Sequence, residues 1–299
     1  MILRQDVTDN FLNLFTKAME NEPLERGNRL NVFVLKVANN RFDYGTLTEQ
    51  LGEAMIRYAI SRKKYQDLAA QNMHFKLTKI AQEKFRNADV NTGELGELLL
   101  YCLLESHLNA PKLLTKLELK TSANDYVKGA DGVHLLQLDE RTFQIIFGES
   151  KLYGDLNQGI RAAFESIGEM VSNRLNKIFF EKHLVDSNLL KENVSEDKLQ
   201  LLKKILIPSE NDENLEVDYS FGVFLGFNIP ITDEERQVSN SQFRNDIIAK
   251  VREVVTNQIN TINGYLKKTD FIGYQFYFYV MPFEELAKIR TEIVKNLVS

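Results

Sequence analysis

The 299-residue sequence contains a single cysteine, Cys102, so the chain cannot form an internal disulfide bond. Proteins of reducing compartments have this composition, and residues 1–6 lack the apolar core of a secretory signal peptide. No apolar stretch reaches the length that a membrane-spanning helix needs. Together these absences predict a cytoplasmic protein.

Several common binding motifs are also missing. The four histidines, His74, His107, His134 and His183, have no metal-ligand spacing, and one cysteine cannot build a zinc site. No Gly-x-x-x-x-Gly-Lys-Ser/Thr loop is present, which excludes ATP binding through a P-loop. If the function requires DNA to be unwound, another protein must supply the motor.

Acidic residues outnumber basic residues, 42 to 37. The formal net charge of -5 argues against a free-standing, strongly basic nucleic-acid binder. Four lysines, Lys112, Lys116, Lys120 and Lys128, nevertheless cluster in one stretch, where they could contact phosphate or form an ordinary solvated surface. A net-negative chain that acts on DNA would need a partner to supply much of the affinity.

What the sequence does contain is an ordered set of carboxylates followed by a lysine. Its members are Glu94 and Glu97 in Gly-Glu-Leu-Gly-Glu, Asp131 in Lys-Gly-Ala-Asp-Gly, and Glu149 and Lys151 in Gly-Glu-Ser-Lys. The last motif ends an apolar run, residues 142–147, that predicts a buried strand. Side chains two apart on a strand share a face, about 6.6 Å from each other. One carboxylate can then bind a divalent metal while the ammonium orients the attacking water, an arrangement that suits phosphodiester hydrolysis.

Each acidic residue also has a purely structural interpretation. Asp131 lies between two glycines, where aspartate commonly serves a turn, but its spacing of 18 residues from Glu149 across a hairpin favours a site. Glu94 and Glu97 share a helix face, and acids at a helix start stabilise the dipole by about 0.3–1 kcal/mol. We favour Glu97 as the functional acid, with Glu94 as the alternative.

Periodicity predicts an α/β fold with a mixed central sheet flanked by helices. We expect an N-terminal α/β region over residues 1–90, available for partner docking, and a nuclease-like domain over residues 91–299. The first region should hold a helix at 10–20, a strand at 31–37 and helices at 47–62 and 67–86. The second should hold helices at 93–107, 156–183, 198–206, 233–267 and 283–297, and strands at 116–121, 132–138, 142–151, 219–229 and 274–281.

The acidic motifs resemble those of the PD-(D/E)XK, or restriction-endonuclease-like, nuclease superfamily. The order of elements over residues 93–229 resembles the core of that superfamily. Ala130 stands where a proline would precede Asp131, a departure that is frequent among its members. Over nearly the whole chain, the sequence is similar to the HamA family, the nuclease subunits of the bacterial Hachiman anti-phage system.

The resemblance implies a Mg²⁺ site, with Mn²⁺ as a substitute, held by Asp131, Glu149 and the backbone carbonyl of Ser150. Two carboxylates suffice because Mg²⁺ keeps several waters. Glu97 would act through a metal-bound water, and Lys151 would position the attacking water. Glu94, Lys128 and Gln158 are possible auxiliary residues.

The implied function is a metal-dependent DNA endonuclease or nickase, the effector of an anti-phage complex with a superfamily 2-type, HamB-like helicase. One alternative is a catalytically inactive nuclease-fold adaptor of a helicase, against which the intact Asp131, Glu149 and Lys151 argue. A housekeeping repair or restriction nuclease is another, because it would use the same chemistry.

Overall fold

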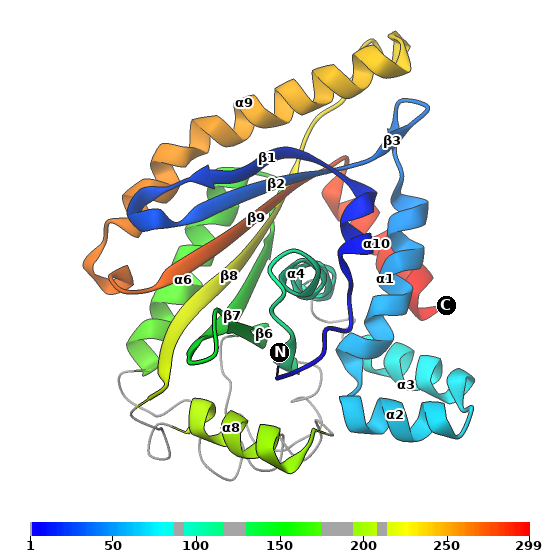
Figure 1. Cartoon of the computed structure of the whole chain (residues 1–299). Helices are drawn as coiled ribbons and strands as arrows, with labels where there is room; N and C mark the ends of the chain where they lie inside the picture. The colour runs from blue at the N-terminus through cyan, green and yellow to red at the C-terminus, as the bar shows by residue number, and fades with distance from the viewer. Residues whose placement is uncertain (1, 87–92, 116–129, 175–193, 208–213) are drawn as a thin grey trace.

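The computed structural model describes residues 2–86, 93–115, 130–174, 194–207 and 214–299. Its centre is a seven-stranded mixed sheet in the order β1-β2-β9-β8-β7-β6-β5 (Figure 1). The strands are β1 Phe15–Pro23, β2 Arg29–Leu35, β5 Lys112–Thr115, β6 Gly132–Gln137, β7 Thr142–Leu152, β8 Glu216–Asn228 and β9 Gln275–Phe283. The pairs β2–β9, β9–β8 and β8–β7 are parallel, and the other three pairs are antiparallel.

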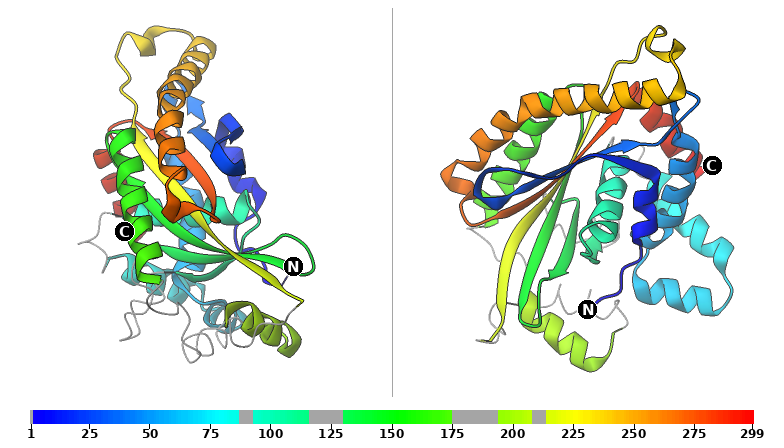
Figure 2. Two further views of the ribbon diagram at one scale, coloured as in Figure 1. Left: turned by 90° about the vertical axis from the view of Figure 1, so that its left-hand side faces the viewer. Right: turned by 45° about the horizontal axis from the view of Figure 1, so that its top comes forward.

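Helices cover both faces of this sheet (Figures 1 and 2). The helices are α1 Tyr44–Ala59, α2 Arg62–Ala70, α3 His74–Arg86, α4 Glu94–Ser106, α6 Leu156–Arg174, α8 Glu196–Leu206, α9 Asn240–Leu266 and α10 Leu286–Val298. Helix α4 packs on β7 and β8 from one side and contacts α1 and α10, while α6 packs on the same strands from the other side and contacts α9. Because β7 and β8 lie between two helical layers, the buried middle of each strand is mostly apolar, at residues 143–148 and 221–227.

Short elements complete the described chain. They are the 3-10 turns Asp9–Leu14, Glu25–Gly27, Glu235–Gln237 and Thr269–Phe271, and a two-stranded ribbon of β3 Val37–Ala38 and β4 Arg41–Phe42. No helix among the described residues is both long and apolar enough to cross a membrane.

Glycines let α4 lie unusually close to the sheet. Gly148 on β7 and Gly222 on β8 are paired neighbours. A Cβ added at Gly222 would lie 2.9 Å from Leu104 Cδ2, and one added at Gly148 would lie 3.1 Å from Leu100 Cδ2. From the helix side, a Cβ at Gly96 would lie 3.1 Å from Ser150 Oγ. This close packing fixes the position of the first turn of α4, which carries two of the predicted acids.

The predicted α/β class with a mixed, helix-flanked central sheet is confirmed. Two local predictions are wrong. Residues 10–20 form a 3-10 turn and the strand β1 rather than a helix, because Phe15 and its neighbours pair with β2 and tertiary pairing overrides local helix preference. The helix predicted over residues 67–86 is divided into α2 and α3, where Asn72 adopts a left-handed φ of 58° that reverses the chain.

Other predictions fall outside the described residues. These are the strand at 116–121, although β5 ends immediately before it, and the part of the helix at 156–183 that follows Arg174. The proposed boundary near residue 90 also lies there. The division into two regions stays a prediction, but β1 and β2 of the first region continue the sheet of the second through β9.

Candidate functional site

The predicted motifs meet where β7 runs past the start of β6. Gly132, the first residue of β6, pairs with Gly148, and β7 continues to Leu152 beside β8. Asp131 immediately precedes β6, beside the part of β7 that extends beyond the Gly132–Gly148 pair. Its backbone N–H donates to the Gly148 carbonyl at 2.9 Å. Its Oδ2 accepts hydrogen bonds from the N–H and the hydroxyl of Ser150, each at 2.8 Å. One backbone bond and two carboxylate bonds therefore hold Asp131 beside the Glu-Ser-Lys motif.

Glu149 and Lys151 form an ion pair on one face of β7. The Lys151 Nζ lies 2.6 Å from Glu149 Oε1, which confirms that the two side chains share a face. Side chains alternate along a strand, and Ser150 faces α4 through its contact with Gly96. Glu149 and Lys151 accordingly face α6, whose Ser166 hydrogen-bonds to Glu149.

The charges of this pair are strongly perturbed. Burial and then the nearby charge of Asp131 raise the pKa of Glu149 to about 7, against the opposing effects of Lys151 and Ser166. Burial favours the neutral amine of Lys151, but attraction to Glu149 and Asp131 outweighs it and raises the pKa of Lys151. Lys151 is therefore a cation at neutral pH, suited to donating hydrogen bonds and stabilising negative charge, and unsuited to acting as a base.

The acids of α4 approach from the opposite face. Glu94 and Glu97 are both buried, and the Tyr58 hydroxyl donates to Glu97 Oε2 at 3.1 Å. Burial, and after it the charges of Glu97, Asp131 and Glu94, raise the pKa of Tyr58 well above its ordinary value. Asp131 is thus an electrostatic neighbour of Glu149 on one side and of the Tyr58–Glu97 pair on the other, so it links the two halves of the site.

The remaining predicted residues contribute less. Gln158 is exposed at the start of α6, where its N–H donates to Asp155 Oδ1, and its auxiliary role stays a prediction. Lys128 lies outside the described residues, as do Lys116 and Lys120. Lys112 is fully buried, and its ammonium donates to three backbone carbonyls. The suggestion that Lys112 contacts phosphate is wrong, because this ammonium caps a helix end instead.

Two residues at the site were not predicted. Tyr58 and Ser166 come from helices α1 and α6, and their contacts join positions far apart in the sequence. Both helices are recognisable from periodicity, but periodicity does not say which residue of a helix meets a carboxylate of another element.

The donor set fits a hard divalent cation. The described residues contain no group of three His, Cys, Asp or Glu side chains placed to hold a metal. Asp131 and Glu149 nevertheless supply carboxylate oxygens. The raised pKa of Glu149 reflects burial first and then repulsion from Asp131, which a cation would relieve. The N–H and C=O of one strand residue point to the same side, so the Ser150 carbonyl faces the Asp131 edge, as its N–H does.

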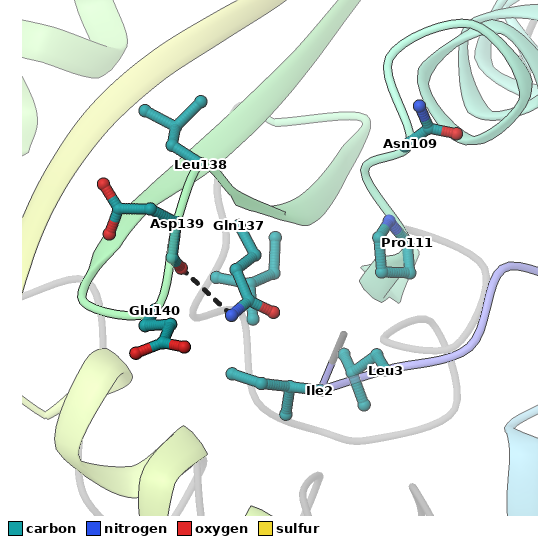
Figure 3. Close-up of a pocket in the computed structure, with 9 residues that line it drawn as sticks. Ile2, Leu3, Asn109, Pro111, Gln137, Leu138, Asp139 and Glu140 are labelled. Carbon is teal, nitrogen blue, oxygen red and sulfur yellow. Dashed lines mark hydrogen bonds between the residues drawn. The ribbon is translucent and has the colours of Figure 1, made fainter.

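A separate hollow of about 390 Å³ lies at the other end of β6 and β7 (Figure 3). Its lining combines the chain start, at Ile2 and Leu3, with the β6–β7 turn, where Gln137 donates to the Asp139 carbonyl at 3.0 Å. None of the predicted site residues belongs to this lining. The hollow is therefore distinct from the acidic site.

Comparison with known proteins gives one match. The family model described as HamA matches residues 9–297, nearly the whole chain and every predicted site residue. No curated protein and no solved structure matches the chain.

Proposed function

Because this chain belongs to the HamA family, we propose that it is the metal-dependent nuclease subunit of an anti-phage defence complex. The observation that carries the chemistry is the convergence of Asp131, Glu149 and Lys151 at one strand edge. The element order α4-β5-β6-β7-α6-β8, with an antiparallel meander followed by a parallel fourth strand, supports a restriction-endonuclease-like core. Family membership favours defence over housekeeping repair.

The residues divide the work as follows. Asp131, Glu149 and the Ser150 carbonyl would hold Mg²⁺ or Mn²⁺, with Glu97 acting through water. When bound, such a cation lowers the pKa of a water and offsets negative charge in the transition state. Ser150 keeps Asp131 oriented through its N–H and hydroxyl. Lys151, charged and partly exposed, orients the attacking water and stabilises charge that develops on the phosphate.

The central test is cleavage of supercoiled plasmid by the purified chain, alone and with its helicase partner, in Mg²⁺ or in chelator. We expect metal-dependent nicking or cutting by the complex, with the chain alone much weaker. Absence of cleavage by the complex in both Mg²⁺ and Mn²⁺ would reject the nuclease function. Strong cleavage by the isolated chain would reject control by the partner and leave the chemistry intact.

Replacing Lys151 by alanine should remove cleavage but leave divalent-metal binding largely in place, because the ammonium is not a metal ligand. Loss of a group that stabilises transition-state charge typically costs about 10²–10³-fold in rate. Calorimetric titration with Mn²⁺ at several pH values measures the binding, because loss of Lys151 also removes an effect that lowers the pKa of Glu149.

Lys288→Ala is the matched control, because Lys288 also pairs with a glutamate, at 3.0 Å, but on the exposed surface of α10. Complete loss of Mn²⁺ binding in Lys151→Ala would mean that the lysine holds the carboxylates in place instead.

The partner should dock on the N-terminal region. Protein affinity for DNA rests mainly on phosphate contacts, and a net charge of -5 attracts DNA poorly. A helicase partner would therefore supply much of the DNA affinity. Deleting residues 1–90 would remove β1 and β2 from the sheet, so point substitutions are the cleaner probe. Phe75, 82% exposed at the start of α3, is the most exposed large apolar side chain of the described residues.

Phe75→Ser is therefore expected to weaken the complex at least tenfold, as truncation of an aromatic anchor does. Ile272→Ser is the control, because Ile272 is 57% exposed but lies outside the N-terminal region. Pull-down and calorimetry with the helicase measure both. If both variants bind the helicase equally well, the α2–α3 turn is not part of the docking surface.

A further inference from the structure

We propose that Tyr58 of helix α1 is a positioning residue of the nuclease site, holding the Glu97 carboxylate through its hydroxyl. The proposal rests on the proposed function and extends it to the N-terminal region, to which docking alone had been assigned. Its basis is the 3.1 Å hydrogen bond from Tyr58 to Glu97 Oε2, between two buried side chains of different elements. A buried carboxylate needs hydrogen-bond donors to offset its desolvation penalty, and the Tyr58 hydroxyl is one that holds Oε2 in place.

The backbone of Tyr58 is held unusually firmly. Tyr58 lies one residue before the end of α1, where carbonyls lack partners within the helix. Its carbonyl accepts from Lys112 Nζ and from Thr115 Oγ1, each at 3.1 Å. Lys112 also donates to the carbonyls of Arg57 and Ile60, at 2.5 and 3.3 Å, so one buried ammonium caps the whole helix end. Lys112 and Thr115 of β5 thereby fix the backbone position from which the Tyr58 side chain extends.

The ring of Tyr58 is equally confined. It packs against Phe85 of α3 with ring centroids 6.1 Å apart, and against Tyr101 of α4 with centroids 5.3 Å apart. All three rings are almost completely buried. A ring packed on two sides cannot change rotamer without opening the core, so the hydroxyl is delivered to one place.

The hydroxyl is also a permanent donor. A tyrosine hydroxyl, with an ordinary pKa of about 10, carries its proton at neutral pH and can donate to a carboxylate. A fixed donor facing a cluster of carboxylates is the arrangement by which an outer residue orients an acid that acts on a metal-bound water. Tyr58 touches neither metal nor substrate and acts through Glu97.

Four full-length proteins test the proposal, each studied in complex with the helicase: the wild type, Tyr58→Phe, Glu97→Gln and the double variant. Loss of an outer partner of a metal site typically costs about 10–100-fold in metal affinity or activity. We expect Tyr58→Phe to lower Mn²⁺ affinity and kcat by about tenfold with KM for DNA unchanged. In the Glu97→Gln background, the same change should have almost no further effect, because the residue through which Tyr58 acts has lost its charge.

Tyr101→Phe is the matched control, because it removes a neighbouring buried hydroxyl whose electrostatic partners are Glu105 and Asp6 rather than Glu97. Urea unfolding of the same four proteins gives a readout without metal or DNA, in which Tyr58 and Glu97 should also be coupled. Additive effects in unfolding and in Mn²⁺ affinity would overturn the proposal. If the wild-type complex does not cleave DNA, the nuclease function fails, while the two couplings still decide whether Tyr58 holds Glu97.

Discussion

Alanine at Asp131 or at Glu149 is expected to reduce DNA cleavage more than about 100-fold, because each substitution removes a proposed direct metal ligand and even outer partners of a metal site cost about 10–100-fold. The fold should survive. Asp131 is half-buried at a strand edge, and Glu149 bears the cost of burial and of repulsion from Asp131, as its pKa of about 7 indicates. We therefore expect the melting temperature of Glu149→Ala to equal or exceed that of the wild type. Asp131→Ala also loses the two hydrogen bonds from Ser150 and should melt slightly lower. Both variants should still bind the helicase.

Plasmid cleavage in Mg²⁺ measures the rate, and thermal unfolding measures the fold. Asp139→Ala is the matched control, since Asp139 caps the turn at the other end of β6 by accepting from the N–H groups of Arg141 and Thr142. That variant should lose some stability and no activity. Cleavage at the wild-type rate by either Asp131→Ala or Glu149→Ala would show that the metal site is assigned wrongly.

The parts of the site that sequence predicts are those fixed by local rules. Alternation along a strand places Glu149 and Lys151 on one face, and the 2.6 Å ion pair confirms it. Asp131 comes next to them because a short turn at residues 139–141 sets the register that pairs Gly132 with Gly148. Both rules operate within about twenty residues of chain, so the pattern alone suffices.

The parts that sequence misses depend on contacts between distant segments. Strand β1 exists because it can pair with β2, which in turn joins the sheet through β9 from the other end of the chain. Lys112 belongs to a basic run that indicates solvent exposure, yet it is buried because the end of α1 presents carbonyls to it. Tyr58 reaches Glu97 across 39 positions. None of these pairings leaves a periodic signal in the sequence.

Arg62→Ala is expected to destabilise the fold by about 3–5 kcal/mol, the usual cost of breaking a buried ion pair from one side. Arg62 is almost completely buried, with Nε 3.3 Å from Asp6 Oδ2 and Nη2 3.6 Å from Glu105 Oε1. Glu105, fully buried, also accepts from the backbone N–H groups of Asp6, Val7 and Lys112. This network joins the residues near Asp6 to α2, α4 and β5. Its loss should therefore loosen the packing of all four segments.

The destabilisation should grow with pH. Burial and then the charge of Asp6 raise the pKa of Glu105 to about 7, against the opposing effect of Arg62. A carboxyl whose pKa is higher in the folded state stabilises the fold when protonated, and this contribution is lost as pH rises from about 4.5 through 7. Without the guanidinium, the pKa of Glu105 rises further, so Arg62→Ala should lose more stability at pH 8 than at pH 5.5.

Urea unfolding at these two pH values measures the effect. Arg57→Ala is the matched control, because Arg57 also pairs with Asp6, at 3.4 Å, but its side chain is 33% exposed, against 6% for Arg62. Exposed pairs contribute about 0–1 kcal/mol, and stacking of Arg57 on Tyr65 adds a similar amount. Equal, small losses of unfolding free energy in the two variants would mean that Arg62 is not needed to stabilise the Glu105 carboxylate, because water or backbone N–H groups do so. A loss that is large but independent of pH would assign it to packing of the arginine side chain rather than to its charge.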